Sequence, residues 1–215
     1  MSKPYHTALC GDRYDGRMKG LVCGLFVGGQ ARRMGGAAKG LLPAPDSGEP
    51  LVLRLRRHAE SLGLRCLLVG SAPAYAGLGL PMLTDDPPGI GPLGGLRALL
   101  VAADPGPVLA LACDLPYVSP ALLRRLVEAA PVAADGPGDV VAARRQGRWE
   151  PLCARYEATV LPTLTAALQA GERSFQGLLR RLQVRELSLS AAEAAELTDW
   201  DSPDDIGAPP SDRQR

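Results

Sequence analysis

Residues 21–27 form an apolar run that ends in glycines, and this run constrains the fold more than any other feature of the sequence. A continuous apolar run, with no alternation of polar and apolar residues, is typical of a strand buried on both faces. Such strands occur in parallel sheets that carry helices on each side. The run therefore predicts an α/β protein.

The rest of the chain alternates short apolar runs with helical patterns. Further strands are expected at residues 66–69, 81–84, 108–112, 140–143, 151–154 and 184–187, with 140–143 and 151–154 as a hairpin-like pair. Helices are expected at residues 50–62, 92–102, 119–127, 161–168, 175–182 and 190–197. This alternation predicts a mostly parallel, Rossmann-like three-layer α/β fold.

The length of 215 residues and the share of 46% hydrophobic residues suit one globular domain. Residues 1–17 are polar and aperiodic, so we expect a disordered extension there, a single domain at 18–206 and a frayed tail at 207–215. A net charge of +1 predicts no nucleic-acid partner. No apolar run reaches the ~20 residues of a membrane span, and the first residues lack a signal-like apolar region, so a cytoplasmic protein is expected.

The cysteines and histidines do not form a pattern that indicates chemistry. The five cysteines are odd in number, lack a C-x-x-C spacing and are expected to act as small buried apolar residues. Neither His6 nor His58 lies at a predicted strand end. Nucleophilic catalysis by a Ser/His/Asp or Cys/His set is therefore not indicated.

Ligands of open α/β sheets bind beyond the carboxyl ends of the strands, which selects three loops. The first, residues 28–40, reads G-G-Q-A-R-R-M-G-G-A-A-K-G. Its glycines, Gly28 and Gly29 among them, can present bare N–H groups to phosphate oxygens. Arg33 and Lys39 can add charged contacts to the same anion. A flexible basic surface loop is the alternative, but the order of residues directly after a buried strand favours an anion site.

The other two loops carry carboxylates. Asp85 lies in a Gly/Pro-rich stretch where it can accept hydrogen bonds from a nucleoside, although a solvated turn is the alternative. Asp114 follows the predicted strand 108–112, where a carboxylate is well placed to hold Mg²⁺ on bound phosphates. Near the C-terminus, Asp199 and Asp201 alternate, so one of them could share that metal. Taken alone, an acidic C-terminal turn is the favoured interpretation of those two residues.

The segments F-V-G-G-Q-A-R-R-M-G-G-A-A-K-G-L-L, G-P-L-G-G-L, A-C-D-L-P-Y and L-Q-A-G-E-R-S-F occur in this order. In order and spacing they resemble the molybdenum-cofactor guanylyltransferases, and the resemblance covers residues 18 to about 206. It implies a nucleotidyltransferase fold and the transfer of GMP from GTP, with Mg²⁺ as cofactor, to molybdopterin or Mo-molybdopterin. It also implies transient contact with cofactor-biosynthesis proteins or molybdoenzymes.

By motif position, the resemblance implies that Arg33, Lys39 and Asp114 are catalytic and that Asp114 binds the metal. The residues implied to bind GTP are Phe26, Val27, Gly28, Gly29, Lys39, Gly70, Asp85 and Asp114. The chain departs from the usual pattern at Ala38, at Gly70 and around Asp199 to Asp201. The alternatives are transfer with CTP and a molybdopterin, transfer to a sugar or alditol phosphate, and a nucleotide-binding module without catalysis.

A further set of arginines could bind an anionic pterin, although solvated helix and hairpin faces explain most of them. They are Arg144, Arg145, Arg148, Arg173, Arg180 and Arg181.

Overall fold

The computed structural model describes residues 20–27, 38–129, 132–133, 136–137 and 139–207. The predicted extension at 1–17 and nearly all of the predicted tail at 207–215 lie outside the described residues. The described part contains no helix that is both long and apolar enough to cross a membrane.

The core of the fold is a seven-stranded sheet in which every strand except β8 runs in the same direction. Its order is β3-β2-β1-β4-β8-β7-β9. The strands are β1 (Val22–Phe26), β2 (Arg65–Val69), β3 (Met82–Leu83), β4 (Val108–Ala112), β7 (Val140–Arg145), β8 (Arg148–Tyr156) and β9 (Val184–Glu186). A separate pair is formed by β5 (Val132–Ala133) and β6 (Gly136–Pro137). The prediction of a mostly parallel α/β fold is confirmed.

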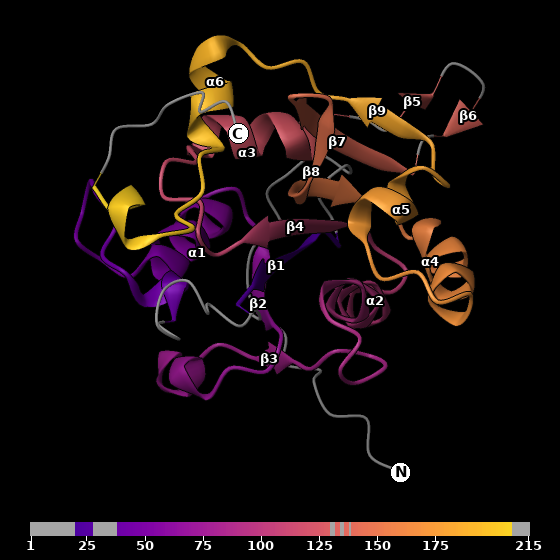
Figure 1. Ribbon diagram of the computed structural model, residues 1–215, viewed down its shortest axis with the longest axis horizontal. Helices are drawn as coiled ribbons and strands as arrows, with labels where there is room; N and C mark the ends of the chain where they lie inside the picture. The colour runs from indigo at the N-terminus through magenta and orange to yellow at the C-terminus, as the bar shows by residue number, and fades with distance from the viewer. Residues whose placement is uncertain (1–19, 28–37, 130–131, 134–135, 138, 208–215) are drawn as a thin grey trace.

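Helices cover both faces of the sheet and complete three layers (Figure 1). One face packs against α1 (Leu51–Glu60) and α3 (Pro120–Glu128), with α6 (Ala191–Glu196) beside α3. The other face packs against α2 (Pro92–Ala103), α4 (Val160–Gln169) and α5 (Phe175–Leu179).

Local sequence explains most helix boundaries. Pro92 occupies the first turn of α2, and the side chain of Ser119 caps α3 by accepting a hydrogen bond from the N–H of Leu122 (3.2 Å). Helix α5 is shorter than predicted, because the N–H of Arg181 bonds to the carbonyl of Leu178 and tightens its last turn.

The strand order reverses beside β1. From β1 the chain passes through α1 to β2 and on to β3, and α2 then returns it to β4 on the other side of β1. This reversal is the topological switch point at which open α/β sheets bind ligands. The carboxyl ends of β1, β3 and β4 lie at the same edge of the sheet.

Candidate active site

Lys39 is held at this edge by a short helical turn, η2 (Lys39–Leu41). The N–H of the next residue, Gly40, donates to the hydroxyl of Tyr75 (3.0 Å), which is itself only 2% exposed. A Cβ atom at Gly40 would lie 3.0 Å from both the Tyr75 hydroxyl and the Cβ of Cys113. Glycine therefore lets η2 sit directly on the end of the sheet, which fixes the backbone of Lys39.

The ammonium group of Lys39 contacts two carboxylates from distant parts of the chain. Its Nζ lies 3.0 Å from Oδ2 of Asp114 and 2.8 Å from Oδ1 of Asp201. Burial by itself would lower the pKa of Lys39, but the hydrogen bond to Asp201 and the charge of Asp114 outweigh it and raise that pKa. We call Lys39, Asp114 and Asp201 the lysine cluster.

The segment after α6 is fastened to the end of β4. The N–H of Trp200 donates to the carbonyl of Asp114 (3.1 Å), and the Trp200 side chain packs against Ala44 and Leu51. Beyond it, Oδ2 of the buried Asp205 accepts from the N–H of Asp201 (3.1 Å). These contacts place the Asp201 carboxylate opposite Asp114.

A second part of the edge lies around Asp85, which follows β3. A Cβ atom at Gly95 would lie 3.1 Å from the Phe26 ring and 3.5 Å from Oδ1 of Asp85, so the three residues adjoin one another. Burial raises the pKa of Asp85, and a hydrogen bond from the backbone of Gly91 opposes that rise. A carboxylate that is partly withdrawn from water binds a hydrogen-bond donor more strongly than an exposed one does.

Two residues expected to contact the nucleotide, Gly70 and Phe26, already use parts of their main chain. The N–H of Gly70 donates to the carbonyl of Leu83 (2.8 Å), and the carbonyl of Phe26 accepts from the N–H of Cys113 (3.2 Å). The side chains of Phe26 and Val27 are buried, each 6% exposed. Gly70 can therefore offer a nucleotide its carbonyl oxygen but not its N–H.

Gly28, Gly29 and Arg33 lie outside the described residues. Of the two aspartates left open by the sequence, Asp201 is the one that contacts Lys39. The sequence does not reveal Tyr75 or Trp200, because their contacts join segments that are far apart in the chain.

The donor set around Lys39 fits the expected Mg²⁺. Two carboxylates converge on one ammonium nitrogen, and Mg²⁺ usually takes one or two protein carboxylates together with substrate phosphates. Within the described ranges, no group of three or more His, Cys, Asp or Glu side chains is arranged to hold a metal. Asp114 and Asp201 therefore suit an ion shared with a substrate.

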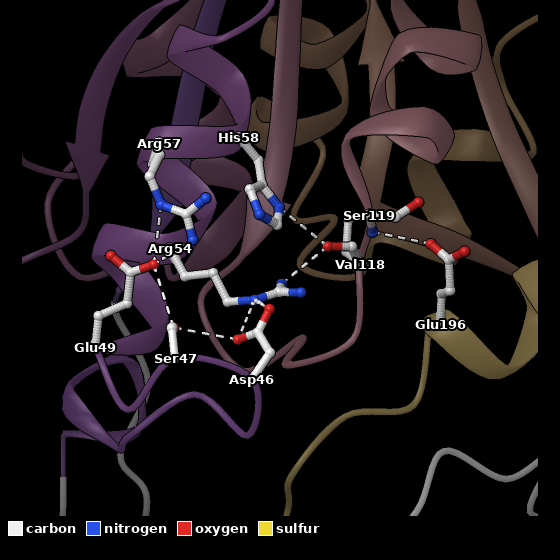
Figure 2. Close-up of polar contacts among 9 residues, drawn as sticks. All are labelled: Asp46, Ser47, Glu49, Arg54, Arg57, His58, Val118, Ser119 and Glu196. Carbon is white, nitrogen blue, oxygen red and sulfur yellow. Dashed lines mark hydrogen bonds and ion pairs between the residues drawn. The ribbon is translucent and has the colours of Figure 1, made fainter.

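A different polar cluster lies between α1 and the start of α3 (Figure 2). Arg54 donates through Nε to both carboxylate oxygens of Asp46 (3.0 and 2.9 Å) and through Nη1 to the carbonyl of Val118 (2.9 Å). The Nδ1–H of His58 donates to the same carbonyl (3.2 Å). We call Asp46, Arg54, His58 and Val118 the arginine cluster.

The four described cysteines, Cys23, Cys66, Cys113 and Cys153, are free and buried, as expected from the sequence. Burial raises the pKa of the Cys113 and Cys153 thiols to about 12. Such thiols are protonated and unreactive at neutral pH.

The fold places the chain in the class of α/β proteins that bind ligands beyond the carboxyl ends of a parallel sheet, and the lysine cluster lies at that edge. Comparison with known proteins narrows this class. The MobA-like NTP transferase domain matches residues 23–186.

Curated relatives that bear the name molybdenum cofactor guanylyltransferase match most of the chain. The molybdenum cofactor guanylyltransferase of Pseudomonas fluorescens is 35% identical over 76% of this chain and 80% of its own length. The protein of that name from Xanthomonas euvesicatoria is 30% identical over 84% of this chain and 89% of its own length.

Solved structures agree on the fold. Molybdopterin-guanine dinucleotide biosynthesis protein A from Archaeoglobus fulgidus is 22% identical, with a TM-score of 0.67 over 86% of this chain and 94% of that chain. The chain belongs to the MobA-like NTP transferase family, and it is a nucleotidyltransferase.

Proposed function

We propose that this protein transfers GMP from GTP to molybdopterin or Mo-molybdopterin, giving the guanine dinucleotide form of the cofactor and pyrophosphate. The observation that carries the proposal is the lysine cluster at the switch point of the sheet, in a chain whose relatives bear the name molybdenum cofactor guanylyltransferase.

The spacing of the polar residues suits a nucleoside triphosphate. Asp85 follows β3 and Asp114 follows β4, and three strand spacings separate these strands, on the order of 14 Å. We assign the base to the Asp85 end and the phosphates to the lysine cluster. Lys39 has three N–H donors, two of which bind carboxylates, so one remains to contact a phosphate oxygen.

The reaction needs little covalent help from the protein. An oxygen of the acceptor phosphate, ionised at neutral pH, bonds to the α-phosphorus while the bond to pyrophosphate breaks. Lys39 orients the triphosphate, and Asp114 and Asp201 would hold Mg²⁺. The metal supplies charge neutralisation on the phosphates. No general base is required, because the nucleophile already carries its negative charge.

The base preference follows from the chemistry of Asp85. Guanine has N1–H and N2–H₂ donors for an ionised carboxylate, whereas adenine presents an acceptor at N1. An unpaired buried group costs ~1–3 kcal/mol, and two mismatches would disfavour ATP by about a hundredfold or more. Cytosine is smaller and fills less of the pocket, so CTP is the more competitive alternative.

Steady-state kcat/KM for GTP, CTP and ATP with molybdopterin as acceptor tests the proposal. We expect GTP to be the preferred donor. A CTP value equal to or above that of GTP would overturn the guanylyl assignment, and turnover with a sugar phosphate in place of molybdopterin would overturn the acceptor.

We also propose that the protein acts in the cytoplasm. There it would make transient contact with cofactor-biosynthesis proteins or molybdoenzymes. Fractionation of cells that produce the tagged full-length chain, followed by crosslinking, tests both.

A further inference from the structure

The hairpin of β7 and β8 carries a basic and aromatic surface that the proposed chemistry does not yet use. The guanidinium carbon of Arg144 lies 5.3 Å from the centroid of the Trp149 ring, within cation–π range. Trp149 packs partly against the core on the α2 side of the sheet, whereas Arg144 is exposed. The stacked pair therefore presents the guanidinium, not the indole, to solvent.

Both members of the pair are held in place. Arg144 also donates through Nε to the carbonyl of Gly147 (3.0 Å). The main chain of Trp149 is bonded twice by the side chain of Gln176, which donates through Nε2 to its carbonyl (2.8 Å) and accepts from its N–H (3.3 Å). A preorganised surface loses little conformational entropy when a ligand binds.

The A-G-E-R-S-F stretch supports this arrangement. The side chain of Ser174 accepts from the N–H of Gly177 (2.9 Å) and so starts α5, the helix that carries Gln176. Glu172 accepts from the N–H groups of Arg173 (3.0 Å) and Ser174 (2.9 Å). The stretch thus starts α5, and Gln176 of α5 holds Trp149 in the hairpin.

The strand register puts the pair at the same edge as the lysine cluster. Ala110 of β4 pairs with Ala154 of β8, which pairs with Ala142 of β7. The register of β7 with β8 shifts between Ala142 and Arg144, where Arg144 pairs with Trp149. Because β7 runs parallel to β4, Arg144 lies toward the edge of the sheet at which β4 ends. Two strand spacings, about 10 Å, separate β4 from β7, and Asp114 follows β4, so the pair lies at the same edge as the site.

The charge of this surface is not fully neutralised by the protein. Arg145 is paired with Glu150 (2.6 Å). The terminal nitrogens of Arg144 and the guanidinium of exposed Arg148 have no hydrogen bond or ion pair with any other residue that the structure describes. A guanidinium stacks on planar rings and binds anions through its edge.

We propose that Arg144, stacked on Trp149, binds the planar heterocycle of the acceptor, and that Arg148 contacts an anionic group attached to it. This inference rests on the proposed function, because it requires the acceptor phosphate to reach the lysine cluster while its ring lies on the hairpin. It identifies residues that select a ring-bearing acceptor over a simple sugar phosphate.

Direct binding tests the inference without turnover. The chain has two tryptophans, so Trp200→Phe leaves Trp149 as the single fluorescent reporter. We expect 6-carboxypterin, a planar anion, to quench this fluorescence saturably and glycerol phosphate not to do so, with N-acetyltryptophanamide as the optical control. Arg144→Ala in the same background should weaken pterin binding about tenfold or more, as lost stacking does. Arg124→Ala, an exposed arginine on α3, is the charge-matched control and should change nothing.

Kinetics with molybdopterin supply the second readout. Arg144→Ala and Trp149→Leu should each raise the acceptor KM about tenfold, with the GTP KM unchanged in both and the melting temperature unchanged in Arg144→Ala. Arg144→Lys should behave like Arg144→Ala, since it keeps the charge but loses the plane.

Different results would contradict the proposed function and the inference about the hairpin. An unchanged acceptor KM in Arg144→Ala and Trp149→Leu, with normal GTP turnover and no pterin quenching, would overturn the inference alone. Saturable quenching in a protein that uses another nucleotide would overturn the proposed donor and leave the inference standing.

Discussion

Lys39 and Arg54 lie on successive segments of the chain, and each holds a positive charge against carboxylate oxygen. In the arginine cluster one cation meets one carboxylate and a main-chain carbonyl, so the charges balance (Figure 2). In the lysine cluster one cation meets two carboxylates. The arginine cluster joins α1 to the start of α3, whereas the lysine cluster brings together the two carboxylates that we propose hold the metal. Four substitutions separate these roles.

Asp114→Asn should have the largest effect. It removes the carboxylate that we propose holds Mg²⁺ without changing the volume of the side chain, so we expect turnover to fall about a thousandfold or more while the fold is retained. Asp46→Asn is the matched control, since it removes the carboxylate of the arginine cluster and should leave turnover unchanged. Near-normal turnover of Asp114→Asn at saturating Mg²⁺ would show that the metal assignment is wrong.

Lys39→Ala should have the second-largest effect on activity. Loss of the charged contact to the triphosphate should lower kcat/KM by about a hundredfold, through weaker GTP binding and weaker transition-state stabilisation together. Arg57→Ala, which removes an exposed ion pair with Glu49, is the control. If Lys39→Ala raised only the acceptor KM, the lysine would belong to the acceptor rather than to GTP.

Arg54→Ala should affect stability instead of chemistry. It leaves Asp46 without its cation and removes one of two donors to the Val118 carbonyl, so we expect unfolding to become easier by about 2 kcal/mol. Chemical denaturation measures this, and kcat/KM below the melting temperature should stay at the original value. The exposed pair of Arg56 and Glu60 provides the control, because Arg56→Ala should cost less than about 0.5 kcal/mol.

The smallest effect should come from the protonation of His58. Burial lowers the pKa of His58, and the charges of Arg54 and Arg57 add to this. The folded state therefore prefers the neutral ring, whereas the unfolded chain protonates near pH 6.5. The stabilisation is complete above about pH 6.5 and is lost as the pH falls below that value toward the lowered folded pKa.

His58→Asn tests this pH dependence. Asparagine can keep a donor toward Val118 but does not titrate. We expect the free energy of unfolding to depend less on pH between about pH 5 and pH 7 in this variant. An identical pH slope in the two proteins would exclude His58 as its source.

The sequence predicts the fold well where the pattern is local. Residues 108–112 carry only apolar side chains and form β4 with the predicted bounds. Leu51, Leu55 and His58 fall on one face of α1 and are buried, as is Leu62, which was predicted in the same helix but follows its end at Glu60. The expected length of α5 was wrong, because the backbone hydrogen bonds that end it are not encoded in the periodicity of the apolar residues.

The site is predicted less completely, because its geometry depends on contacts between distant residues. Lys39 and Asp114 lie in loops that the sequence marks as candidate ligand sites, and their side chains form an ion pair. Asp201 lies in an ordinary acidic turn, and it is placed by the bond from Trp200 to Asp114, the packing of Trp200 and the bond to Asp205. Tyr75 reaches Gly40 across 35 positions, which no local pattern indicates.

The bond between Trp200 and Asp114 has a consequence for the protein during its synthesis. Asp201 follows Lys39 by 162 positions, so a growing chain holds its lysine and first carboxylate long before the second one is translated. A nascent chain, or one clipped by a protease before residue 200, lacks both the main-chain bond to Asp114 and the second carboxylate that contacts Lys39. The lysine cluster is therefore complete only after nearly the whole chain has been made.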